Sequence, residues 1–181
     1  MNDELTALAN TQTRELVPLP TGKNIVGSKW VYKVKTLSDG SLERYKARLV
    51  AQGFSQEYGI DYDETFAPVA KMTTVRTLIS VAAAHHWSLF QLDVKNAFLN
   101  GHLAEEVYMR PPPGLSHPPG MVCRLRRALY GLKQSPRAWY ERFHSVALQL
   151  GFRTSHHDSA LFVRRTSGGL VLLLLYVDDM I

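Results

Sequence analysis

The sequence has very little cysteine and no long apolar run. Cys123 is the only cysteine, so no disulfide can form within the chain, and an intracellular, reducing compartment is expected. No stretch reaches the roughly 20 consecutive apolar residues of a membrane-spanning helix, and residues 1–4 lack the basic head of a signal peptide. Internal repeats and low-complexity segments are also missing. The sequence therefore favours neither a membrane protein nor a secreted, disulfide-bonded one.

The chain has enough apolar sequence for one core, and an excess of positive charge. Of its 181 residues, 45% are hydrophobic and 20% are charged, which fits a single globular domain. The formal net charge is +5, a mild indication of a polyanionic partner.

The positive charge is concentrated in two segments. The first basic segment, residues 23–52, has seven Lys and Arg residues against two acids. The second basic segment, residues 124–142, has six against one, and the rest of the chain is net acidic. This distribution suits a protein that binds phosphate groups at defined places. Each segment taken singly is equally compatible with a solvated basic face.

Alternation with a period of two predicts strands in the first basic segment. From residue 25 to residue 36, aromatic and apolar side chains alternate with Lys29, Lys33 and Lys35, which therefore share one face. The Ser-Asp-Gly sequence at 38–40 is a turn signal, and residues 44–51 can return as a second strand. We expect a β-hairpin that presents several cations to phosphate groups.

The remaining patterns predict an N-terminal lead-in followed by one folded domain. A short helix over residues 3–10 and an extended stretch over residues 16–20 make residues 1–20 a partly ordered lead-in to a domain of residues 21–181.

Two longer helices have start and stop signals. One begins at Thr73 or Thr74 as N-cap and ends near His86, with a core-facing apolar stripe. The other begins at Ser135 as N-cap and ends near residue 150, where Gly151 stops it.

Two adjacent acids follow an apolar run near residue 180. Residues 170–175 are expected to form a fully buried strand, which leads into Tyr176-Val177-Asp178-Asp179. Two neighbouring carboxylates at a strand end repel each other unless a cation lies between them, and oxygen-only ligands favour Mg²⁺ or Mn²⁺. The alternative is a polar hairpin turn, because Asp is a common turn residue.

A third acid stands in a similar setting. Residues 87–94 are expected to form a strand whose apolar residues give way to Asp93. This carboxylate could complete a metal site with Asp178 and Asp179, as a ligand from a different strand of the same sheet. Taken alone, it is as readily a capping or salt-bridging acid.

These residues, in this order, carry a resemblance to a known family. The chain resembles the reverse transcriptase of copia-like LTR retrotransposon polyproteins from about residue 16 onward, although Arg14 stands where that family usually has tryptophan. The matching stretches are Lys29-Trp30-Val31-Tyr32-Lys33, Tyr45 through Ala51, Gly59 through Pro68, Gln91 through Gly101, Glu106 through Met109, Ala128 through Tyr140, and Tyr176-Val177-Asp178-Asp179.

The resemblance implies an α+β fold with the fingers and part of the palm of a right-hand polymerase, built on an antiparallel sheet with packed helices. The reaction implied is RNA- and DNA-templated DNA synthesis from deoxynucleoside triphosphates on a primed template. Asp93, Asp178 and Asp179 would be the catalytic carboxylates that hold two Mg²⁺ or Mn²⁺ ions. A cytoplasmic location, in retroelement particles, follows from the family.

Other residues receive roles by the same resemblance. Lys33 or Lys35, and Lys46 or Arg48, are the candidates for the incoming triphosphate, and Phe98 would reject a ribose 2′-hydroxyl. Tyr130, Gly131 and Gln134 would line the nucleotide and template surface. The candidates for contact with nucleic acid are Lys29, Gly131, Lys133 and Arg137.

The resemblance also implies parts that residues 1–181 do not include. We expect no thumb, no ribonuclease H or integrase domain, and no returning strand after Asp179, so that Asp178 and Asp179 are poorly fixed and the chain is inactive alone. The alternative function is a non-catalytic nucleic-acid-binding remnant or a domesticated fragment.

Overall fold

The computed structural model describes residues 1–181, except the side chain of Asn2. The fold is α+β, as expected: the described residues form three α-helices, two short 3-10 helices and three antiparallel or mixed sheets. In chain order the elements are α1 (Asn2–Asn10), β1 (Arg14–Pro18), β2 (Ile25–Val26), β3 (Ser28–Thr36), β4 (Leu42–Ala51), η1 (Gly53–Ser55), α2 (Met72–Ala84), β5 (Leu92–Asp93), η2 (Ala97–Asn100), β6 (His102–Met109), β7 (Met121–Arg127), α3 (Ser135–Gln149), β8 (Arg153–Thr154), β9 (Leu161–Thr166), β10 (Gly169–Tyr176) and β11 (Asp179–Met180). None of these helices is long and apolar enough to cross a membrane.

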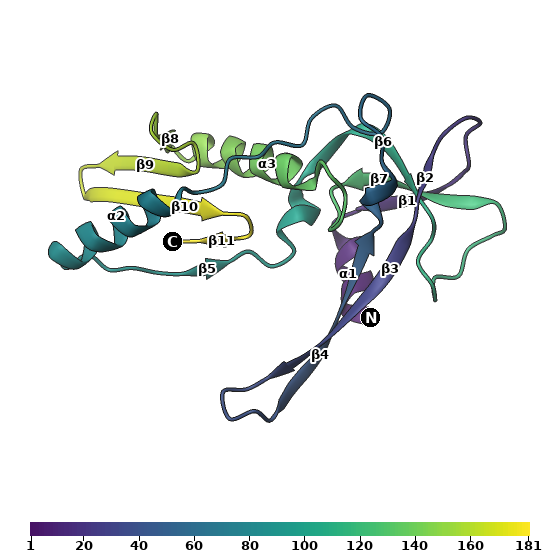
Figure 1. The fold of residues 1–181 in the computed structure, drawn as a ribbon, viewed down its shortest axis with the longest axis horizontal. Helices are drawn as coiled ribbons and strands as arrows, with labels where there is room; N and C mark the ends of the chain where they lie inside the picture. Colours follow the sequence, from purple (N-terminus) through teal and green to yellow (C-terminus); the bar gives the residue numbers. More distant parts are fainter.

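The molecule is elongated, with one sheet at each end and a hairpin that projects away from both (Figure 1). The first sheet has the strand order β1-β7-β6-β2, and the second has the order β5-β11-β10-β9-β8. Strands β3 and β4 form the projecting hairpin that was expected from the alternation of residues 25–36 and the turn signal at 38–40.

The second sheet is covered on both faces, because successive residues of a strand point to opposite sides. Leu175 packs with Phe162 and with Ala147 of helix α3, whereas Leu174 packs with Ala160 and with Val75 of helix α2. The apolar run 170–175 was expected to be fully buried, and that prediction is wrong for its first half. Leu174 and Leu175 are buried, but Leu170 and Val171 are 38% and 49% exposed.

The N-terminal residues pack firmly against the first sheet. Leu8 of helix α1 is buried in the main core beside Leu49 and Met109. The expected extended lead-in forms strand β1, which pairs with β7 along its whole length. Arg14 begins this strand opposite Leu125.

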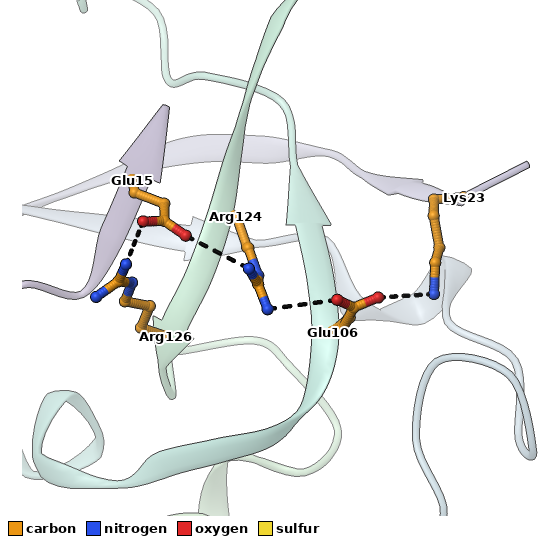
Figure 2. Close-up of polar contacts among 5 residues, drawn as sticks. All are labelled: Glu15, Lys23, Glu106, Arg124 and Arg126. Atoms are coloured by element: carbon orange, nitrogen blue, oxygen red, sulfur yellow. Dashed lines mark hydrogen bonds and ion pairs between the residues drawn. The ribbon is translucent and has the colours of Figure 1, made fainter. Parts of the chain in front are cut away.

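Five charged side chains form a continuous chain of ion pairs across the first sheet (Figure 2). Arg124 of β7 contacts Glu106 of β6 at 3.3 Å and Glu15 of β1 at 3.7 Å. Glu106 also contacts Lys23 at 2.9 Å, and Glu15 also contacts Arg126. The hydrogen bond from Lys23 is the main reason why the pKa of Glu106 lies below its usual value. Each exposed pair contributes little to stability by itself, but together the pairs connect side chains of three adjacent strands.

Helix α2 starts without the side-chain cap predicted from the sequence. Its N-cap is Lys71, which makes no side-chain capping bond, and neither Thr73 nor Thr74 is the cap. Instead, Asp158 caps the helix from a distant loop by accepting a hydrogen bond from Lys71 N at 2.9 Å. Burial would raise the pKa of Asp158, but hydrogen bonds from Thr74, Lys71 and Ala160 outweigh burial and lower it. Of the predicted stripe, only Ala82 is fully buried, and Ile79 is 44% exposed.

Helix α3 confirms the predicted stop and corrects the predicted start. Gly151 follows the helix with a positive φ of 82°, a conformation that favours glycine. Ser135 is the first helical residue rather than the N-cap, because Gln134 occupies that position. The Ser135 hydroxyl donates instead to the carbonyl of Leu129 at 2.6 Å, which ties the helix start to the preceding loop.

Candidate active site

The two adjacent acids lie on a tight turn that is fixed from three sides. Tyr176 pairs with Asp179 across the turn, so Val177 and Asp178 form its tip. Val177 has a positive φ of 57°, which is costly for a β-branched residue and more usual for Gly or Asn in such turns. The indole Nε1 of Trp139 donates to Val177 O at 2.7 Å. The turn is therefore held by a neighbouring helix as well as by its own strands.

The expectation that no strand returns after Asp179 is wrong. Strand β11 follows the turn directly, and Leu174 and Ile181 exchange two backbone hydrogen bonds of 2.8 and 3.0 Å. Asp178 and Asp179 are consequently fixed, because β11 is bonded to β10 on one side and to β5 on the other.

Asp93 lies directly opposite Asp179 on the neighbouring strand β5. The predicted strand over residues 87–94 is reduced to Leu92–Asp93, because only these two residues pair with β11. Val94 N donates to Asp178 O at 3.0 Å, just beyond the pair. Asp93 and Asp179 thus form a non-hydrogen-bonded pair, in which Cα atoms are only about 4.5 Å apart and the side chains share one face.

The three carboxylates do not form a finished metal cage. Among the described residues, no three His, Cys, Asp or Glu side chains are arranged around one ion position. Asp93 and Asp179 face each other, whereas Asp178 turns toward Tyr130, whose hydroxyl donates to its Oδ2 at 3.4 Å. Mg²⁺ often takes only one or two carboxylates and completes its shell with water and substrate phosphates. The donor set therefore fits divalent ions that bind together with a triphosphate.

One face of the β3–β4 hairpin is cationic along its length. The register places Lys33 opposite Lys46, Lys35 opposite Arg44, and Val31 opposite Arg48. Directly opposed residues share a face, so these cations and Lys29 lie on one side, as the alternation predicted. Lys29, Lys33, Lys35, Lys46 and Arg48 make no ion pair with any residue that the structure describes.

Lys46 and Arg48 connect this cationic face to the acids. The pKa of Lys46 is lowered, first by burial and then by Arg48, Lys35 and Arg44, while Asp93 acts in the opposite direction. Arg48 places its guanidinium carbon 3.8 Å from the centre of the Tyr130 ring. Arg48 is thus the hairpin cation that the structure links to the carboxylates, through the Tyr130 ring and its hydroxyl.

Phe98 and Tyr130 form an aromatic floor beside the turn. Their ring centres are 4.5 Å apart, and Phe98 is only 8% exposed. Burial raises the pKa of Tyr130, while Arg48 lowers it and Asp178 raises it, with the net result that the hydroxyl stays protonated. The structure therefore places Tyr130 next to Asp178, with Phe98 packed against the Tyr130 ring.

The structure does not bring Gln134 to an open surface. This side chain is 2% exposed, accepts from Gln56 Nε2 at 3.0 Å and donates to Asp61 O at 3.1 Å. With its amide fully engaged inside the protein, Gln134 joins the loop after η1 to the start of α3. The prediction that it contacts a nucleotide is corrected to a structural role.

The neighbouring candidates are also engaged by the protein. Lys133 donates to Gln56 O and to the Tyr62 hydroxyl, and Arg137 pairs with Glu141 at 2.8 Å. Gly131 has a φ of 94°, and a Cβ at this position would lie 2.1 Å from the carbonyl oxygen of Ala51. Only a glycine allows this close approach between the loop and the end of β4.

Three residues that join the elements around the site by hydrogen bonds were not predicted from the sequence: Trp139, Gln56 and Asp158. Trp139 of helix α3 carried a signal, because a buried indole N–H requires an acceptor and thus indicates a structural hydrogen bond. Gln56 and Asp158 had no signal in the sequence, because the partners that link them to other elements, Gln134, Lys133 and Lys71, are at least 77 residues away in the chain.

Comparison with known proteins identifies the family to which the chain belongs. Residues 11–181 match the family model described as reverse transcriptase (RNA-dependent DNA polymerase). The chain belongs to the reverse transcriptase family. This reverse transcriptase chain is 48% identical, over its whole length, to the retrovirus-related Pol polyproteins from transposons RE2 and RE1 of Arabidopsis thaliana. It is 47% identical to the corresponding polyprotein from transposon TNT 1-94 of Nicotiana tabacum, and 34% identical over 88% of its length to a Ty1 Gag-Pol polyprotein of Saccharomyces cerevisiae.

The resemblance to copia-like reverse transcriptases is thereby confirmed. The chain spans about 13% of the length of the Arabidopsis polyproteins that it matches. Reverse transcriptases in general use divalent metal ions and a nucleic-acid template.

Proposed function

We propose that this chain supplies the nucleotidyl-transfer centre of an RNA-directed DNA polymerase, with the hairpin as fingers and the second sheet as palm. The observation that supports this most strongly is the placement of Asp93 opposite Asp179, beside Asp178, with Arg48 against the Tyr130 ring that contacts Asp178. Acids alone would repel a triphosphate and cations alone would only bind it. A site with both can hold the phosphates and the divalent ions that accompany them.

Each side chain has a defined part in this proposal. Asp93, Asp178 and Asp179 would hold two Mg²⁺ ions, which would supply Lewis-acid stabilisation of the attacking and leaving oxygens. Lys46 and Arg48 orient the triphosphate, and Lys33 and Lys35 extend the cationic track along the hairpin. The buried ring of Phe98 sets the floor against which the sugar rests.

Metal binding tests the proposal without requiring catalysis. Mn²⁺ binding to residues 1–181, followed by electron paramagnetic resonance, should weaken strongly in Asp93→Asn and Asp179→Asn, because each removes one charged oxygen ligand. Asp63→Asn is the matched control, since it removes an exposed acid from a distant loop. Equal Mn²⁺ affinity in all three variants and the unaltered chain would refute the proposal.

We also infer that residues 1–181 extend a primer poorly on their own. The described residues include no counterpart of the thumb that clamps primer and template in a right-hand polymerase, so a bound duplex would dissociate quickly. Robust Mg²⁺-dependent extension by this chain, lost in Asp178→Asn, would contradict the inference.

A non-catalytic nucleic-acid-binding protein is the second candidate, and the unpaired cations of the hairpin favour it. Nucleic-acid binding would then depend on salt and remain unchanged in Asp93→Asn, and no specific Mn²⁺ binding would be seen.

A further inference from the structure

Tyr130 joins the hairpin to the turn that carries the acids. Its carbonyl accepts a hydrogen bond from Ala51 N at 2.8 Å, which anchors its backbone to the end of β4. Gly131 follows in close contact with the carbonyl of Ala51. The Tyr130 backbone is therefore fixed relative to the hairpin.

The ring of Tyr130 is fixed by contacts of two kinds. The guanidinium of Arg48 lies 3.8 Å from its centre, at the distance of a cation–π contact. The Phe98 ring packs at 4.5 Å with an angle of 59° between the planes. A ring that is held in this way can direct its hydroxyl to only a narrow range of positions.

That hydroxyl is the sole side-chain hydrogen-bond partner of the Asp178 carboxylate among the described residues. The Asp178 backbone is held by Val94, but its carboxylate would otherwise rotate freely about its side-chain bonds. The bond to Oδ2 leaves Oδ1 free to face an ion. Groups that hydrogen-bond to a metal-binding carboxylate orient it and affect metal affinity.

We propose that Tyr130 is a positioning residue that orients Asp178 for metal binding, and that Arg48 keeps the Tyr130 ring in place for this purpose. The inference rests on the proposed function, because it assumes that Asp178 is a metal ligand. It assigns to Arg48 a second role besides binding phosphate, and it links the fingers hairpin to the geometry of the acids.

Tyr130→Phe tests the inference by removing one hydroxyl and keeping the ring. The dissociation constant for Mn²⁺, measured on residues 1–181 without nucleotide, should rise about tenfold. Tyr140→Phe is the matched control: its hydroxyl donates to Ser159 O at 2.8 Å, burial likewise raises its pKa, and it does not touch the acids. Tyr140→Phe should leave Mn²⁺ affinity unchanged.

Arg48→Lys is the second variant, which keeps the charge but loses the flat guanidinium face. It should also weaken Mn²⁺ binding, by less than Tyr130→Phe, because the ring gains freedom while the hydroxyl remains. Unaltered Mn²⁺ affinity in Tyr130→Phe overturns the proposal, and unaltered affinity in Arg48→Lys alone overturns the part assigned to Arg48.

The metal-ligand assignment is tested separately. If Asp93→Asn and Asp179→Asn weaken Mn²⁺ binding and Tyr130→Phe does not, the proposed function stands and the role of Tyr130 falls. If none of them has an effect, the proposed function itself fails.

Discussion

The two basic segments carry the same net charge in the sequence, yet in the structure their cations differ in how many have partners within the protein. In the first, Lys29, Lys33, Lys35, Lys46 and Arg48 lie on one face of the hairpin without ion-pair partners among the described residues. In the second, Arg124 and Arg126 belong to the ion-pair chain of the first sheet (Figure 2), and Arg137 pairs with Glu141. Arg127 donates to Asn100 O, and Lys133 to Gln56 O.

The difference comes from where the acids are. The hairpin has Asp39 and Glu43, which lie at or near its tip, and Asp39 is occupied by Ser41. The second segment meets acids from strands β1 and β6, which are distant in the chain but adjacent in the sheet. Local net charge therefore does not identify a phosphate-binding surface; what matters is whether carboxylates from other strands lie within reach.

The largest effect should come from disturbing the contact between Gly131 of the second basic segment and Ala51 of the first. Gly131→Ala would press a Cβ against the carbonyl of Ala51 and force a side chain into a positive φ. We expect a loss of about 4 kcal/mol in the free energy of unfolding, measured with urea. Gly22→Ala is the matched control, because its φ is 75° but no atom lies within 4 Å, so it should lose only about 1–2 kcal/mol. Similar losses in both would show that the contact with Ala51 is unimportant.

A second experiment compares the two segments by the salt dependence of binding to single-stranded DNA. Removing two cations with Lys33→Gln and Lys46→Gln should reduce the slope of log affinity against log salt by about 1.4. Arg126→Gln should leave the slope unchanged, because Arg126 is already neutralised by Glu15. The distinction between the segments would be lost if Arg126→Gln reduced the slope as much per charge as the lysine substitutions.

The smallest effect should come from removing an acid that pairs with the second basic segment, so that this segment, like the first, has a cation without an ion-pair partner. Glu15→Gln removes the acid that pairs with Arg126, so this arginine becomes available to phosphate and the salt slope should steepen, whereas Arg124 keeps its pair with Glu106. The free energy of unfolding should fall by less than about 1 kcal/mol, since the pairs are exposed. Glu57→Gln removes the same charge where no ion pair exists and serves as control. Identical slopes in the two variants would argue that Arg126 cannot reach nucleic acid.

Local patterns in the sequence were sufficient to predict several elements. The hairpin and its cationic face follow from the alternation of lysines with aromatic residues, and the end of helix α3 follows from Gly151. The proximity of Asp93 to the acidic turn was also predicted correctly, because strand ends of one sheet meet at one edge.

Features that depend on distant partners could not be predicted. The cap of helix α2 comes from Asp158, and the amide of Gln134 is buried against Gln56 and Asp61. The exposure of Leu170 and Val171 likewise depends on which elements cover strand β10, and no periodicity in the strand itself contains that information. Propensity and alternation depend on one segment alone. Helix caps, hydrogen bonds of buried amides and the burial of a strand depend on contacts between two segments.

The bond from Trp139 to Val177 gives the chain an optical reporter of its own. Tryptophan emission shifts when the indole N–H exchanges a protein acceptor for water, and the acceptor here is the tip of the turn that carries the acids. Loosening of that turn, by heat, denaturant or substitution, would thus be visible as a change in fluorescence. With Trp30 and Trp87 replaced by phenylalanine, a cuvette measurement would follow the carboxylates without any added label.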